Sequence, residues 1–133
     1  MSTIGAVALA IAAATPALAA PANAATCGLN FCTELIGSGN HITSLGAYLA
    51  PGEPVGSYSD TTGHLQVRWH AGGADHTKSG GDTLIDNAGH ASVVGLNVNV
   101  DANTYVCGRI WDKDGSGYAL YHGQNWQCIK THP

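Results

Sequence analysis

The strongest constraint on the fold is a period-2 alternation of apolar and polar residues. In residues 93–100 the apolar set shares one face: Val94, Leu96, Val98 and Val100. The opposite face carries Asn97 and Asn99. Residues 64–70 repeat the pattern, and no later window keeps a helical period of 3.6. Such alternation is typical of strands with one face against a core, so the sequence predicts an all-β domain.

Turn-forming residues divide the rest of the chain into short strands. Further strands are expected at residues 42–49, 55–58, 105–111, 118–121 and 126–129, with turns at 51–52 and 101–104. Residues 105–111 are expected to return as the hairpin partner of 93–100. Residues 71–90, rich in Gly and Asp, predict a long loop or a loop with a short edge strand. Six to seven strands favour a small antiparallel β-sandwich over residues 42–133.

Four cysteines predict two disulfides. Three pairings are possible, and proximity in the chain favours Cys27–Cys32 and Cys107–Cys128. A zinc site of all four thiolates is the alternative, but the usual C-x2-C pairs are absent. The segment 25–41 is expected to be an irregular arm held by its own small disulfide.

Residues 1–24 resemble a cleaved signal peptide. An apolar run over residues 4–14 is followed by prolines and small residues, which predicts cleavage after Ala24, with Ala19 and Ala25 as alternatives. The run lacks a preceding Lys or Arg, which is atypical. A membrane anchor is the other interpretation, but a span needs about 20 apolar residues and the prolines interrupt this one. We therefore expect a secreted, extracellular domain with no membrane insertion after cleavage.

The charge pattern argues against polyanionic partners. The formal net charge is −4, and the five basic residues are scattered singly along the chain: Arg68, Lys78, Arg109, Lys113 and Lys130. Because no basic stripe exists in the sequence, neither nucleic acid nor an anionic membrane surface is expected as a partner.

Two patterns invite a metal. Asp112, Asp114 and Ser116 fit the first half of a calcium loop, yet Gly123 stands where the bidentate Glu belongs, and a polar hairpin loop is the alternative. For zinc, His64 and His70 lie about 20 Å apart along a strand, too far for one ion. His70 with His76 remains geometrically possible, beside the alternative of solvated surface histidines. No metal or other cofactor is predicted.

Catalytic motifs are absent from the sequence. There is no G-x-S-x-G elbow and no H-E-x-x-H pair, and only two glutamates occur, Glu34 and Glu53. Aspartates paired in space leave a small hydrolase as an alternative. The sequence nevertheless favours a protein that is not an enzyme.

Exposed aromatic residues suggest binding instead. The candidate binding residues crowd into the C-terminal third: Trp111, Tyr118, Tyr121, Asn125 and Trp126. Aromatic rings beside amides suit a sugar or a protein partner. The alternative is a core position over the Cys107–Cys128 bridge, which fits Trp69 and Trp111 better than Trp126. We expect a module that binds an extracellular protein or glycan, and an adaptor subunit of a larger secreted complex is one form of such a module. An enzyme inhibitor or small toxin is the alternative.

Overall fold

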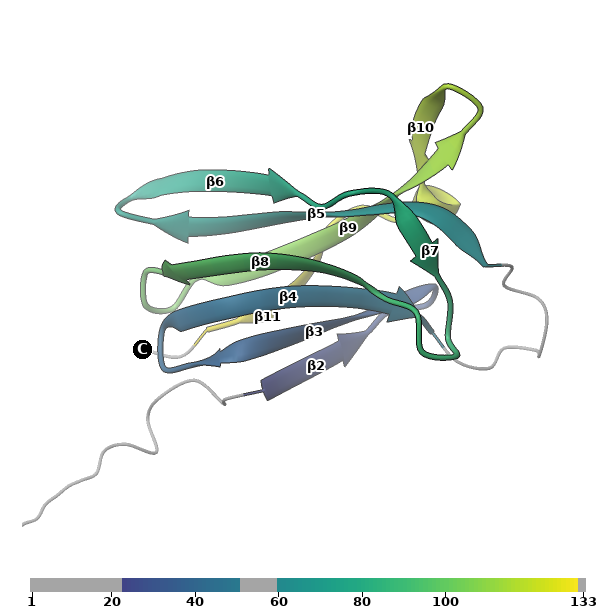
Figure 1. The fold of residues 1–133 in the computed structure, drawn as a ribbon. Helices are drawn as coiled ribbons and strands as arrows, with labels where there is room; N and C mark the ends of the chain where they lie inside the picture. Colours follow the sequence, from purple (N-terminus) through teal and green to yellow (C-terminus); the bar gives the residue numbers. More distant parts are fainter. Residues whose placement is uncertain (1–22, 51–59, 132–133) are drawn as a thin grey trace, which may run out of the picture.

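The chain forms a β-sandwich of two antiparallel sheets. The structure, a computed structural model, describes residues 23–50 and 60–131. One sheet has four strands in the order β2-β3-β4-β8, and the other has six, ordered β10-β9-β5-β6 with β11 beside β9 and β7 beside β5 (Figure 1). The strands are β2 (Asn23–Cys27), β3 (Phe31–Ser38), β4 (His41–Leu49), β5 (Thr61–Ala71), β6 (Ala74–Ser79), β7 (Thr83–Ile85), β8 (Ser92–Asn99), β9 (Tyr105–Asp114), β10 (Gly117–Leu120) and β11 (Gln127–Lys130).

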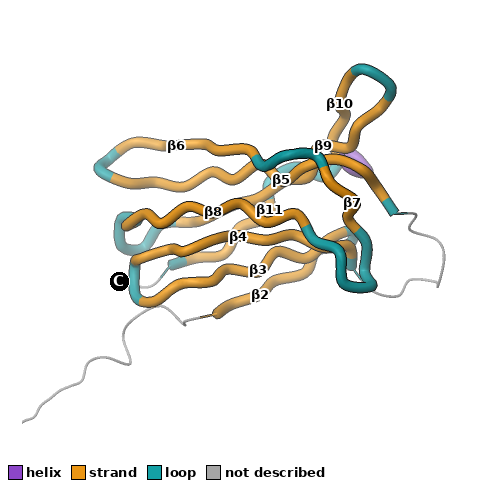
Figure 2. The backbone as a smooth tube through the Cα atoms, in the orientation of Figure 1, coloured by secondary structure: helices purple, strands orange, loops and turns teal. Residues whose placement is uncertain are grey.

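Alternation decides which residues enter the core, as predicted. In β5, Leu65 and Val67 are fully buried and Trp69 is 9% exposed, whereas the residues between them face outward. In β8, Val94 and Leu96 are buried while Asn97 is exposed. The all-β sandwich is therefore confirmed, although the described residues contain more strands than the six to seven expected. Figure 2 shows how little of the described chain lies outside strands.

The predicted irregular arm at residues 25–41 is wrong. Most of this segment belongs to β2 and β3, which form an antiparallel hairpin inside the four-stranded sheet, and Phe31 and Leu35 are core residues. Gln127 ties this hairpin to β11, since its side-chain amide donates to the backbone oxygens of Thr26 and Phe31 at 2.9 and 3.0 Å. The sequence concealed the strand because its inward side chains, Thr33 among them, are not all apolar.

The predicted hairpin between residues 93–100 and 105–111 is also wrong. Both segments are strands, but β8 pairs with β4 and β9 pairs with β5, in different sheets. The turn at 101–104 instead crosses between the sheets. Asp101 holds this crossing, because its backbone NH donates to the His70 oxygen at 2.9 Å and its carboxylate accepts from the NH groups of Gly72 and Gly73.

Residues 71–90 are more regular than a long loop. Strand β6 pairs with β5 along its whole length, from Gln66–Ser79 to Ala71–Ala74, and β7 pairs with the start of β5. Glycines 72 and 73 make the tight turn, with φ of 61° and 78°. The sequence predicted at most one short edge strand in this region. The structure instead has β6, which forms an extended hairpin with β5, and the short strand β7, which pairs with the start of β5. The expected turn at 51–52, the strand at 55–58 and the signal segment 1–22 lie outside the described residues.

Both predicted disulfides are present. Cys27–Cys32 and Cys107–Cys128 each join directly opposite residues of neighbouring antiparallel strands, β2–β3 and β9–β11. No free cysteine remains, so a thiolate zinc site is ruled out. Among residues 23–50 and 60–131, no helix has the length and apolar character needed to cross a bilayer.

The position of strand β2 affects which of the predicted cleavage sites is compatible with the fold. Ala24 packs against the core, and Asn23 and Ala24 pair with Ile36 and Leu35 of β3. Cleavage after Ala24 would remove both residues from β2, whereas cleavage after Ala19 leaves the strand whole. We therefore expect the exported protein to retain Asn23, as intact-mass measurement of material from the culture medium will show. A mass that starts at Ala25 would contradict this site, and a mass that includes Met1 would contradict cleavage altogether.

Candidate binding surface

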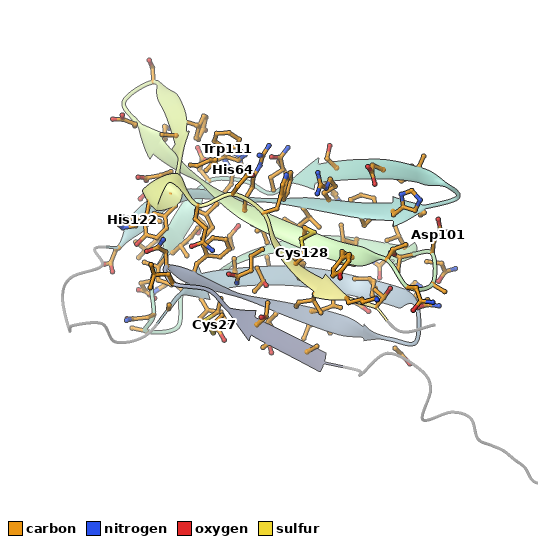
Figure 3. The ribbon with its side chains drawn as sticks, turned by 180° about the vertical axis from the view of Figure 1, so that it is seen from behind. Cys27, His64, Asp101, Trp111, His122 and Cys128 are labelled. Carbon is orange, nitrogen blue, oxygen red and sulfur yellow. A yellow bond between two sulfur atoms is a disulfide. The ribbon has the colours of Figure 1, made fainter. Side chains whose placement is uncertain are left out.

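The outward face of the six-stranded sheet carries a cluster of basic and aromatic side chains. It arises because the polar positions of β5 and the odd-numbered residues of β9 point away from the core. β11 adds its own outward residues beside β9. We call this surface the basic–aromatic face; its members are Arg68, Tyr105, Arg109, Trp111, Trp126 and Lys130. Figure 3 looks onto this side, with Trp111 and His64 side by side and Cys128 nearer the middle.

Trp126 is the centre of the face. The guanidinium carbon of Arg109 lies 4.0 Å from the centroid of its ring and that of Arg68 lies 4.7 Å away. Arg109 also lies 4.8 Å from the ring of Trp111. Cation–π contacts of this kind contribute about 0.5–1 kcal/mol at exposed sites. They fix the two arginines and the two tryptophans relative to one another.

Hydrogen bonds hold the same side chains in place. The Gln66 side-chain oxygen accepts from Nε of Arg109 at 2.9 Å and from Nε1 of Trp111 at 2.8 Å. Asn125 accepts from Nη1 of Arg109 at 2.9 Å and from the backbone NH of Trp126 at the same distance. All these partners are neutral, so the surface is ordered without neutralising its charge.

Among the described residues, neither arginine has a carboxylate partner. No ion pair in the described part of the chain includes Arg68, Arg109 or Lys130. Desolvation, together with the neighbouring positive charge of Arg68, lowers the pKa of Arg109. The protein therefore keeps two like charges close together over one ring, an arrangement whose repulsion an anion would relieve.

The basic residues are scattered along the sequence, but most of them lie on one side of the six-stranded sheet in the fold. By strand parity, four of the five belong to this side of the sheet: Arg68, Arg109, Lys113 and Lys130. Lys78 is the exception, since it pairs with the inward residue Val67 and donates to the Gly95 oxygen at 2.7 Å. The sequence does contain a signal, because the alternation in residues 64–70 places the polar residues, Arg68 among them, on the face away from the core.

An open depression lies beside Arg68. Its volume is about 420 Å³, and its lining includes Arg68, His70, Asp75, Asn103, Thr104 and Tyr105. Tyr105 is 53% exposed, and the ammonium of Lys130 lies 5.9 Å from its ring centroid. His70 pairs with Asp75 at 3.0 Å and with Asp101 at 3.6 Å. The depression thus combines an exposed aromatic ring with several hydrogen-bonding groups.

A second polar cluster, centred on Asp82, lies at the other end of the six-stranded sheet. Asp82 accepts from the hydroxyl of Tyr118 at 2.6 Å, lies 2.8 Å from Nδ1 of His64 and 3.8 Å from Nζ of Lys113. The Tyr118 hydrogen bond, followed by that of His64, lowers the pKa of Asp82. The same bond raises the pKa of Tyr118. Tyr118, a predicted binding residue, is 47% exposed, but it belongs to this cluster and not to the basic–aromatic face.

Of the other predicted binding residues, Trp111, Asn125 and Trp126 do come together. Tyr121 does not join them: it is 4% exposed and belongs to the hydrophobic core. A short 3-10 helix over Tyr121–Gly123 turns its ring inward. The prediction that Tyr121 is part of the binding surface is wrong. Residues that the prediction missed are Gln66, Arg68, Tyr105, Arg109 and Lys130.

The proposed calcium loop is a tight hairpin. Asp114 pairs directly with Gly117, so only Gly115 and Ser116 form the turn between β9 and β10. Asp112 lies within β9 and accepts a hydrogen bond from the hydroxyl of Thr61. A strand and a two-residue turn cannot wrap oxygen ligands around one ion as a calcium loop does. The alternative of a polar hairpin loop therefore describes these residues, and the calcium interpretation does not fit their geometry.

The histidine pair considered for zinc is also separated. Trp69 pairs across the strands with His76 and His70 pairs with Asp75, which puts the two histidines on opposite faces of the β5–β6 hairpin. His76 stacks on Trp69 at 5.5 Å between ring centroids. Within the described ranges, no group of three or more His, Cys, Asp or Glu side chains is arranged to hold a metal ion.

Comparison of the chain with protein-family models, with curated proteins and with solved structures gave no significant match.

Proposed function

We propose that this protein is an exported, non-enzymatic binding module that recognises an extracellular protein or glycan through its basic–aromatic face. Two disulfides in the sandwich support a site of action outside the cytoplasm, where disulfides persist. The face lies on the side of the sheet away from the core, so the fold does not require its tryptophans there.

One observation carries the proposal: Trp111 and Trp126 are held on an outward sheet face by two arginines that lack ion-pair partners in the described part. Trp, Tyr and Arg are the residue types that dominate binding energy at interfaces. Side chains already ordered by stacking and hydrogen bonds lose little entropy on binding. The arrangement therefore suits recognition of a partner.

The chemistry of the Asp82 cluster supports a non-enzymatic role over the small hydrolase. His64 and Asp82 form a hydrogen-bonded pair, but the Tyr118 hydroxyl donates to the same carboxylate rather than to the histidine. The pKa of the Tyr118 hydroxyl is raised, so this phenol stays protonated near neutral pH and is a poor nucleophile. Within the described residues, no Ser, Thr or Cys side chain takes part in the hydrogen bonds that join His64, Asp82 and Tyr118, so the His64–Asp82 pair is better explained as support for the β9–β10 hairpin.

The test is capture of a partner from the producer's culture fluid and from a glycan array, read by mass spectrometry and fluorescence. Trp126→Ala should weaken binding of the captured partner by about tenfold or more, as loss of a central aromatic does. Leu29→Ala is the matched control, because Leu29 is 74% exposed in the turn between β2 and β3. It should bind like the parent.

Tyr105→Ala provides a second variant in case Trp126→Ala does not fold, because half of the Tyr105 surface is already exposed. Binding that survives both folded variants unchanged would contradict the proposal. Hydrolysis of the captured partner would contradict its non-enzymatic part.

A further inference from the structure

We propose that the basic–aromatic face binds an acidic saccharide, whose carboxylate or sulfate group sits between Arg68 and Arg109 while an adjoining sugar ring occupies the depression beside Tyr105. This inference rests on the proposed function and adds the chemical class of the ligand. The proposed site lies at the end of the basic–aromatic face that holds Trp126, Arg68 and Lys130.

The positive charges of the two arginines favour an anionic ligand. Arg68 and Arg109 lie 4.7 and 4.0 Å from the same ring centroid, and no ion pair in the described residues includes either of them. Arg109 uses Nε and Nη1 on neutral oxygens of Gln66 and Asn125, while Arg68 has no hydrogen bond to any side chain of the described part. Guanidinium groups bind planar, two-oxygen anions through paired hydrogen bonds. Arg109, held by hydrogen bonds, and Arg68, held by its contact with the Trp126 ring, therefore form two sides of an anion site.

The surface beside the arginines carries groups that suit a sugar. The depression of about 420 Å³ is continuous with Arg68 and is lined by hydroxyl, amide, imidazole and carboxylate groups. Such groups can exchange hydrogen bonds with sugar hydroxyls. Tyr105, 53% exposed, offers a flat apolar surface beside them. The volume falls in the range of about 300–1,000 Å³ found for small-molecule sites.

Charge around the depression disfavours a nucleic acid. Asp75 lines it and Asp101 lies close to His70 at the same end of the sheet (Figure 3). The chain as a whole carries a net charge of −4. A nucleic acid strand, with a phosphate at every nucleotide, would bring phosphates up to these carboxylates, whereas a saccharide can turn the neutral hydroxyl groups of a sugar ring toward them.

Titration calorimetry on the intact exported protein tests the inference. The probes are oligomers of galacturonate and alginate for the carboxylate, heparin oligomers for the sulfate, methyl-esterified oligogalacturonate as the uncharged match, and oligothymidylate for nucleic acid. We expect at least one acidic oligomer to bind. We expect the methyl ester to bind at least about tenfold more weakly than oligogalacturonate when that oligomer is the ligand.

Two variants that each remove one positive charge locate the site. Arg68→Gln should weaken the acidic oligomer by about tenfold, because it removes a charge-assisted contact. Lys78→Gln is the matched control, since Lys78 lies on the inward side of β6, and should bind like the parent. Neither residue is part of the core, so both variants should fold.

The outcomes separate this inference from the proposed function. Equal binding by Arg68→Gln and Lys78→Gln, tighter binding of oligothymidylate than of every acidic oligomer, or no acidic oligomer bound would each overturn the acidic-saccharide ligand. The proposed function would survive the last result if a captured partner still depended on Trp126. Loss of that dependence would overturn both.

Discussion

Replacing Leu96 by aspartate is expected to destabilise the domain strongly. Leu96 is 8% exposed and belongs to the core on the inward face of β8. An aspartate there would bury an unpaired charge, a change that costs on the order of 4 kcal/mol or more. Small domains are stable by only about 5–15 kcal/mol, so the midpoint of thermal unfolding should fall by about 20 °C or the transition should vanish. Circular dichroism on heating measures both.

The neighbouring Asn97 provides the control for that change. It is exposed, and its φ of 49° lies in the left-handed region, where aspartate is also well tolerated. Asn97→Asp adds the same charge one residue away but should alter the stability by less than about 0.5 kcal/mol. Similar losses in both variants would show that the register of β8 is not the one described.

Removal of the Cys107–Cys128 bridge should produce the second large effect. The bridge spans 21 residues, and the chain-entropy model gives it a stabilisation of about 3 kcal/mol. It also fixes β11 to β9 two residues beyond Trp126, so its loss should loosen the centre of the basic–aromatic face. We expect Cys107→Ala with Cys128→Ala to lower the urea midpoint strongly and to weaken partner binding even where the domain stays folded.

The Cys27–Cys32 bridge is a matched comparison. Each bridge joins one buried and one exposed cysteine of neighbouring strands, but this one spans only 5 residues. Its expected stabilisation is about 2 kcal/mol, so Cys27→Ala with Cys32→Ala should cost about 1 kcal/mol less than the other pair. Partner binding should weaken less than in the other pair, because β2 and β3 belong to the opposite sheet and are joined to β11 through the side chain of Gln127. A larger loss for this pair would contradict the loop-length explanation.

The local sequence pattern was sufficient to predict the core positions of single strands, the two disulfides and the fold class. Period 2 placed Leu65, Val67 and Val94 in the core, because alternate side chains of a strand necessarily point to opposite faces. Cysteine spacing identified both bridges, because each joins strands that are adjacent in the sheet and near in sequence or joined by a short excursion. The absence of a helical period was enough to predict the fold class.

Strand partners and the binding surface were decided by tertiary structure alone. Nothing local distinguishes β8 pairing with β4 from β8 pairing with β9, since either arrangement buries the same face, and only packing of the two complete sheets selects one. For the same reason Arg68, Arg109 and Lys130 look isolated in the sequence. They meet because β5, β9 and β11 lie side by side in one sheet with the same parity, a fact of long-range pairing. Tyr121 shows the converse: composition suggested exposure, but the turn after β10 directs its ring into the core.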